Sequence, residues 1–72
     1  MRWNELAELI KQPYSVLVEI HKSKTKYFLI QNNTYLNLSV TQYNSIIHTG
    51  TLDMHPEITF NNSITEYLYK SK

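Results

Sequence analysis

The sequence predicts a small α+β domain in which helices pack on an antiparallel sheet. Three consecutive segments between residues 14 and 40 are rich in β-branched and aromatic residues that alternate with polar ones, as in half-buried strands. Short amphipathic segments flank this region at residues 3–11 and 42–48. We therefore expect residues 1–72 to form a single domain. Its sheet is predicted to be a three- to four-stranded antiparallel β-meander, with an N-terminal helix, a short helix after the third strand, and a C-terminal helix or strand.

The first segment is predicted to be a helix over residues 3–11. Its apolar residues recur at helical spacing and include Trp3, Leu6, Ala7 and Ile10. Asn4 is expected to cap the helix, and Pro13 is expected to stop it because proline cannot donate the next backbone hydrogen bond. A helix this short is not stable alone, so its apolar stripe must pack on the sheet.

The three central strands are predicted at residues 14–21, 27–31 and 34–40. A lysine-rich connection over residues 22–26 joins the first two, and Asn32-Asn33 suits a tight hairpin turn because asparagine tolerates positive φ. The residues expected to face the core are Val16, Val18, Ile20, Phe28, Ile30, Leu36, Leu38 and Val40. The opposite face is expected to carry Leu17, Tyr27, Leu29, Gln31 and Tyr35 among polar residues.

A second short helix is predicted over residues 42–48. Thr41 is expected to cap its start. Gly50, the single glycine of the chain, is placed to end the helix in the left-handed conformation.

The last part of the chain contains a predicted short strand over residues 57–60. Residues 63–70 support two interpretations. A capping-box pattern that starts at Ser63 favours a helix. A turn at Asn61-Asn62 followed by isoleucine, threonine and tyrosine favours a strand. The helix is the slightly preferred interpretation.

No recognised catalytic or cofactor motif is found in the sequence. A single glycine excludes a phosphate-binding loop in its usual form, and the lack of cysteine excludes disulfides and thiolate metal sites. His21, His48 and His55 are too far apart in sequence for a local metal motif. We therefore expect no enzymatic activity, no cofactor and no metal.

The strongest candidate for a partner-binding site is an aromatic and aliphatic patch on the outer face of the sheet. It is predicted to contain Leu17, Tyr27, Leu29 and Tyr35. Tyrosine is enriched at protein interfaces, and the chain has 6 tyrosines, too many for so small a core. The alternative is that the C-terminal segment covers this face as ordinary core.

The alternative binding site is the group of lysines at the first hairpin. Lys22, Lys24 and Lys26 are predicted to contact nucleic-acid phosphates, with Tyr27 available to stack on a base. The simpler interpretation is a solvated turn, which we prefer because nucleic-acid-binding proteins usually show a broader basic surface than three lysines.

Size and composition favour a protein that works in a complex. A chain of 72 residues without cysteine lies near the lower limit for an independent core, so a homo-oligomer or a partner complex is expected. Many Asn, Ile, Lys and Tyr residues beside one glycine suggest an AT-rich genome. We expect a cytoplasmic phage or mobile-element protein, not bound to membranes, that inhibits or redirects a larger host protein such as a defence system. The alternatives are an RNA- or DNA-binding module and an oligomer that sequesters a small ligand.

Overall fold

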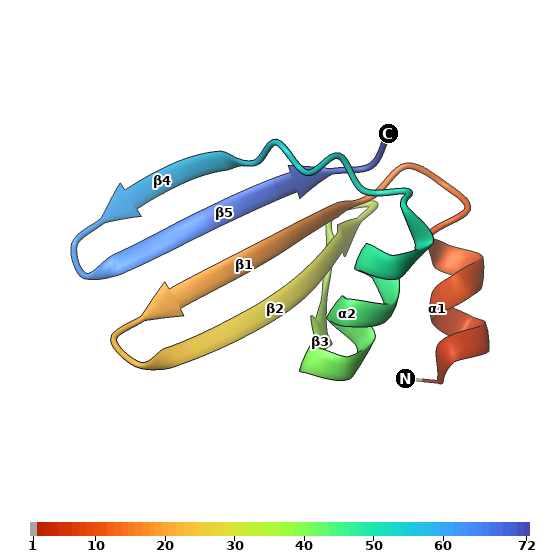
Figure 1. The fold of residues 1–72 in the computed structure, drawn as a ribbon, viewed down its shortest axis with the longest axis horizontal. Helices are drawn as coiled ribbons and strands as arrows, with labels where there is room; N and C mark the ends of the chain where they lie inside the picture. The colour runs from red at the N-terminus through yellow and green to blue at the C-terminus, as the bar shows by residue number, and fades with distance from the viewer. Residues whose placement is uncertain (1) are drawn as a thin grey trace.

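Five antiparallel strands form one sheet in the computed structural model, which describes residues 2–72, and both helices pack on the same side of that sheet (Figure 1). The elements are α1 Trp3–Leu9, β1 Ser15–His21, β2 Lys24–Gln31, β3 Thr34–Leu38, α2 Val40–Thr49, β4 Glu57–Asn61 and β5 Ile64–Lys70. The strand order is β3-β2-β1-β5-β4. The predicted α+β class, the N-terminal helix and the helix after the third strand are confirmed.

The central strand of the sheet is β1, which pairs with β2 on one side and with β5 on the other. Val16 lies opposite Leu29 of β2 and Tyr69 of β5. Residues directly opposite each other project to the same face of a sheet. Each residue of β1 therefore shares its face of the sheet with the residue opposite it on β2 and the residue opposite it on β5.

The predicted inward face of the second strand is wrong. Phe28 and Ile30 were expected to face the core, but Leu29 is the residue of β2 that is fully buried. Because Leu29 pairs with Val16, it points toward the helices, and Phe28 pairs with Leu17 on the other side. A shift of one residue exchanges the two faces of a strand.

The cause of this error is the turn between β1 and β2. The connection was predicted over residues 22–26, but only Lys22 and Ser23 lie between the paired residues His21 and Lys24. Lys22 adopts a positive φ of 58°, which permits this two-residue turn. Strand β2 therefore starts at Lys24, and the two-residue turn determines which of its side chains face the helices.

The C-terminal segment is a strand, so the slight preference for a helix was also wrong. Asn61 pairs with Ile64 across a turn in which Asn62 has a positive φ of 57°. Strand β5 is hydrogen-bonded to β1 on one side and to β4 on the other. A helix here would leave the edge of β1 unpaired, so the sheet has five strands where three or four were predicted.

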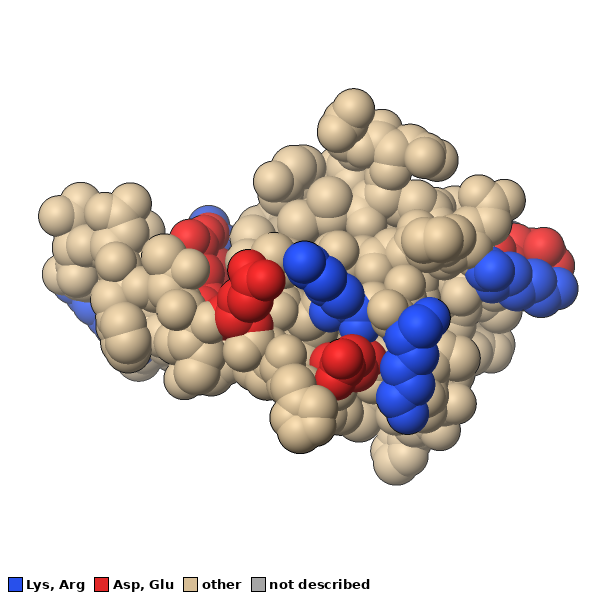
Figure 2. Space-filling model, turned by 90° about the horizontal axis from the view of Figure 1, so that it is seen from above, with Lys and Arg blue, Asp and Glu red and all other residues tan. Residues whose placement is uncertain are grey.

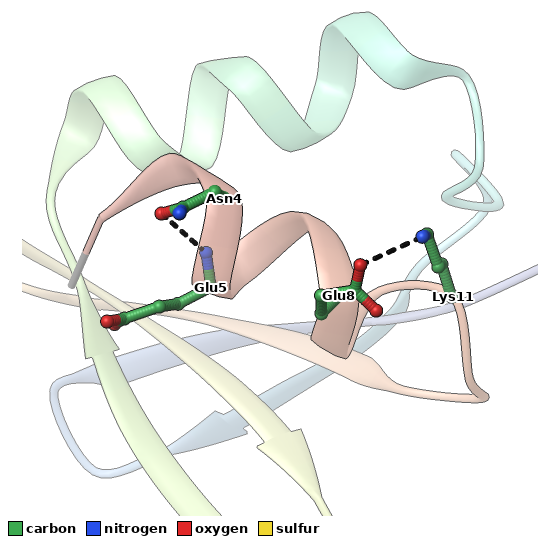
Figure 3. Close-up of polar contacts among 4 residues, drawn as sticks. All are labelled: Asn4, Glu5, Glu8 and Lys11. Carbon is green, nitrogen blue, oxygen red and sulfur yellow. Dashed lines mark hydrogen bonds and ion pairs between the residues drawn. The ribbon is translucent and has the colours of Figure 1, made fainter.

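Helix α1 begins without the predicted cap. The N-cap residue is Arg2 and no side chain caps it. Asn4 instead accepts a hydrogen bond on its Oδ1 from the Glu5 backbone N–H at 3.0 Å, and Lys11 forms an exposed ion pair with Glu8 (Figure 3). Exposed pairs of this kind contribute about 0–1 kcal/mol, so packing must hold α1 in place.

Helix α2 has stronger local signals. Its N-cap is Ser39 instead of Thr41, and Ser39 forms a capping box with Gln42. Because the cap lies at Ser39, β3 ends at Leu38 and Val40 is the first residue of the helix, not an inward strand residue. Gly50 ends α2 with a φ of 71°, as predicted.

The hydrophobic core lies between the helices and one face of the sheet. Its buried members are Leu6, Tyr14, Val16, Val18, Leu29, Leu38, Ile46 and Leu52. Gln31 links the end of β2 to the last residue of α1 and to the segment after it, because its Nε2 donates to the carbonyl oxygens of Leu9 at 2.7 Å and Pro13 at 3.2 Å. The turns at Lys22-Ser23 and Asn62-Ser63 project beyond the helices (Figure 1).

We predict that Leu29→Ala destabilises the protein far more than Leu17→Ala. Leu29 is fully buried, so its truncation should lower the free energy of unfolding by about 2–5 kcal/mol. Leu17 lies on the other face of the same strand pair and should lose about 1 kcal/mol or less. Urea unfolding followed by circular dichroism measures both. A larger loss from Leu17→Ala would contradict the register.

Candidate interaction surfaces

The sheet face opposite the helices is not covered by any element among residues 2–72. The strand residues on this face include Leu17, Glu19, His21, Lys24, Lys26, Phe28, Ile30, Tyr35, Glu66 and Leu68. None of them is buried, and none belongs to the core cluster or packs against it. We call this surface the open face.

One part of the open face is an apolar strip that crosses four strands. Leu17 in β1 lies between Phe28 of β2 and Leu68 of β5. The rings of Phe28 and Tyr35 meet edge to face, with centroids 6.4 Å apart and an interplanar angle of 71°. Tyr35 remains 63% exposed, so this aromatic pair is accessible from solvent.

The other part of the open face carries charges of both signs. Glu19 lies between Lys26 and Glu66, and His21 lies opposite Lys24. Four of these side chains line a hollow of about 180 Å³, namely Glu19, His21, Lys24 and Lys26. The two lysines and two carboxylates balance, so the open face has little net charge when His21 is neutral.

The predicted partner-binding residues do not form one surface. Leu17 and Tyr35 lie on the open face, but Tyr27 and Leu29 lie on the helix side. Leu29 is core, and Tyr27 stacks on Tyr43 of α2 with ring centroids 4.4 Å apart. The placement of these two residues was therefore wrong.

Phe28 is the open-face residue that the sequence interpretation missed. The Asn32-Asn33 turn, whose φ values are 52° and 61°, contained the necessary signal. A two-residue turn pairs Gln31 with Thr34, so it places Leu29 on the same face as Leu36. Leu36 was already expected to face the core, and this pairing would have moved Phe28 to the outside.

The three lysines lie together at the end of the first hairpin. Lys24 and Lys26 are on the open face, on the same side of β2 as Phe28, and Lys22 is in the turn. All three side chains are exposed. Acidic and basic side chains are interspersed on the surface seen in Figure 2, without a broad basic area.

A groove of about 710 Å³ lies between α1 with the segment that follows it, the end of α2 and the last two residues of the chain. Its apolar lining includes Trp3, Ala7, Ile10 and Pro13. Its hydroxyl groups bond to one another: Tyr14 with Thr51 at 2.7 Å, and Thr51 with Thr49 at 2.8 Å. The Thr49 hydroxyl donates to the Ile46 carbonyl oxygen. Each of the three hydroxyl protons is therefore already donated within the protein.

The described residues contain neither a cluster of metal-binding side chains nor a helix that could span a membrane. Between residues 2 and 72, no three or more His, Cys, Asp or Glu side chains gather closely enough to hold an ion. His21, His48 and His55 are exposed on different segments. Within the same residues, neither helix has the length and apolar character needed to cross a bilayer.

Comparisons with protein-family models, curated proteins and solved structures found no match. Function must therefore be inferred from the surfaces of this chain. The open face combines aromatic, aliphatic and charged side chains on one side of the sheet.

We predict that Tyr43 makes stability fall at alkaline pH. Burial, the nearby Tyr69 and its hydrogen bond, and then Tyr27 raise the pKa of Tyr43 to about 12. The unfolded chain loses this proton near pH ~10, whereas the folded protein keeps it. The stabilisation is therefore complete below pH ~10 and is lost as the pH rises from ~10 to ~12.

The measurement is the urea midpoint at about pH 8 and about pH 11. Tyr43→Phe should make the drop between these values smaller, whereas Tyr35→Phe, on an exposed ring, should leave the drop unchanged. An equal drop in Tyr43→Phe and in the unmodified protein would contradict the assignment.

Proposed function

We propose that this chain is a non-enzymatic protein-binding module that docks its open face on a larger protein. The observation that supports this most is the apolar strip on a sheet face that no described element covers. Contiguous exposed apolar surface on a small protein commonly marks an interaction site. Phe28 and Tyr35 form the aromatic centre of this strip.

The chemistry of the open face also fits a protein partner better than other partners. Protein interfaces combine aromatic and aliphatic residues at the centre with a polar or charged rim. On the open face, Leu17 and Phe28 are central, and Glu19 and Lys26 lie toward the hairpin end. Charges of both signs would orient the partner without attracting polyanions in general.

The more specific proposal concerns the setting. The chain is small, its amino-acid composition suggests an AT-rich genome, and it has no catalytic motif. Such a chain is suited to act by occupying a surface of another protein. We propose a cytoplasmic phage or mobile-element protein that inhibits or redirects a host protein, such as a component of a defence system. Size and composition support this version, and the open face supplies its binding surface.

Nucleic-acid binding is the second candidate, and one observation favours it. Lys24, Lys26 and Phe28 lie at alternate positions on the same side of β2, so two cations and one partly exposed aromatic ring share a face. Single-stranded nucleic acids bind to surfaces that combine cations with aromatic rings. Glu19 and Glu66 oppose this binding because they would repel phosphates beside the lysines.

The test compares two variants in affinity capture from a bacterial lysate treated with nuclease. In the first, Tyr35→Ser and Phe28→Ser remove the aromatic centre; in the second, Lys22, Lys24 and Lys26 become alanine. We expect a discrete protein that binds the unmodified chain, loses at least ~90% of its binding to the first variant, and keeps most of its binding to the second.

A matched control is Met54→Ser, which changes an apolar residue that is 50% exposed and lies in the segment before β4. Circular dichroism must first show that each variant is folded. Capture that depends on the three lysines and disappears with nuclease would overturn the proposal in favour of nucleic-acid binding. Equal capture by all variants would show that the open face is not the binding surface.

A further inference from the structure

The outer edge of the sheet at β4 is exposed along its whole length. All five residues of Glu57–Asn61 are exposed, and β4 has a neighbour on one side only, which is β5. Ile58 is 54% exposed and Phe60 is 77% exposed, although both project to the helix side of the sheet. The helices lie over the other end of the sheet, so these two side chains remain uncovered (Figure 1).

The hairpin turn determines which backbone groups of β4 are unpaired. The turn at Asn62-Ser63 closes with Asn61 and Ile64 as a hydrogen-bonded pair. Hydrogen-bonded and non-hydrogen-bonded pairs alternate along an antiparallel ladder. Thr59 therefore bonds to β5, and the N–H and C=O groups of Ile58 and Phe60 point away from the sheet.

We propose that β4 pairs antiparallel with β4 of a second copy of this chain, around a two-fold axis that passes beside Thr59. In this register, Ile58 exchanges both backbone hydrogen bonds with Phe60 of the second copy. A shift of two residues in one direction would place Pro56, which has no N–H, opposite Phe60. A shift in the other direction would place Asn62, which belongs to the turn, opposite Ile58. Only the Thr59-centred register pairs all outward groups.

The side chains of β4 are compatible with this self-pairing. Ile58 would lie beside Phe60 of the second copy, and aromatic residues pair well with β-branched ones across strands. Thr59 would face Thr59 of the second copy, which is also a favourable pair. Glu57 would face Asn61, so no like charges oppose each other, and Glu57 already has Lys70 at 3.5 Å.

Strand β4 lacks the features that usually protect a sheet edge. Such edges commonly carry lysine, an inward-pointing charge, a bulge or a covering element. The single charge on β4 is Glu57 at one end, and the register with β5 is regular. At the other edge strand, β3, the apolar residues Leu36 and Leu38 already pack under the helices. Pairing with a second copy there would therefore bury less additional apolar surface.

The paired strands are short, so the contact belongs to the small class of interfaces, below about 1,200 Å² in total. We expect a dissociation constant in roughly the micromolar range. The continuous sheet would carry the two open faces on the same side, because the two-fold axis is perpendicular to the sheet. The dimer contact therefore does not use the surface assigned to the larger partner, and the two proposals fail independently.

The first test is a single cysteine in a chain that otherwise has none. Thr59→Cys would place two thiols at a non-hydrogen-bonded pair, where the Cα atoms are about 4.5 Å apart and a disulfide fits. With oxidised glutathione, this variant should form a covalent dimer at least ~10-fold faster than Thr34→Cys. Thr34 is the matched control, since it is an exposed threonine whose backbone also pairs inward, on the opposite edge strand. Equal rates would overturn the proposal.

The second test uses Thr59→Lys and sedimentation equilibrium of the purified chain. Within one chain, the new lysine lies opposite Glu66, which favours folding. In the dimer, two lysines would oppose each other at the axis, so the dissociation constant should rise at least ~10-fold. Thr34→Lys should leave it unchanged. An unmodified chain that remains monomeric at about 0.1 mM, well above a micromolar dissociation constant, would contradict the proposed contact. So would a Thr59→Lys variant that dimerises normally.

Discussion

The pairing of β1 with a strand on each side is the constraint on which the rest of this structure depends. Because β1 is central, the alternation of its side chains determines which residues of β2 and β5 project to each face of the sheet. Val16 brings Leu29 and Tyr69 to the helix side, and Leu17 brings Phe28 and Leu68 to the opposite side. A shift of one residue in either pairing would place apolar core residues in solvent.

Among residues 2–72, the helices cover only one face of the sheet. The two short helices of this described part both pack against the side that carries Val16, Val18 and Leu29. A domain of this size buries only about 60% of the surface of its unfolded chain. Oligomers and partner complexes are the usual way for such chains to bury more, and the open face and the edge of β4 offer two separate surfaces for it.

The sequence predicted the elements better than their registers. The period-2 pattern located β1 and the strand that starts at Glu57, and the tolerance of asparagine for positive φ located the Asn32-Asn33 turn, because these signals are local. The φ of Lys22 could not be foreseen, since lysine is not a usual residue for a positive φ. The error in β2 arose because the first turn was placed over five residues, and it moved Leu29 and Phe28 to the wrong faces. The pairing of Leu29 with Leu36, set by the Asn32-Asn33 turn, would have corrected it.

The candidate site was predicted only in part for the same reason. Leu17 and Tyr35 were placed correctly because β1 and β3 have clear alternation. The C-terminal segment remained ambiguous because Ser63 fits a helix cap, and the pairing of β5 with β1 overrides that local preference. Pairing between residues distant in sequence is not visible in local patterns.

The most direct test of this account is the accessibility of side chains on the two faces of β2 to a soluble paramagnetic probe, measured by NMR. The account predicts strong broadening of the Phe28 and Tyr35 ring signals and of the Leu17 methyl signals. The methyl signals of Leu29 and Val16 should remain sharp. Broadening of Leu29 with protection of Phe28 would contradict the register, and protection of all five residues would contradict the claim that the open face is uncovered.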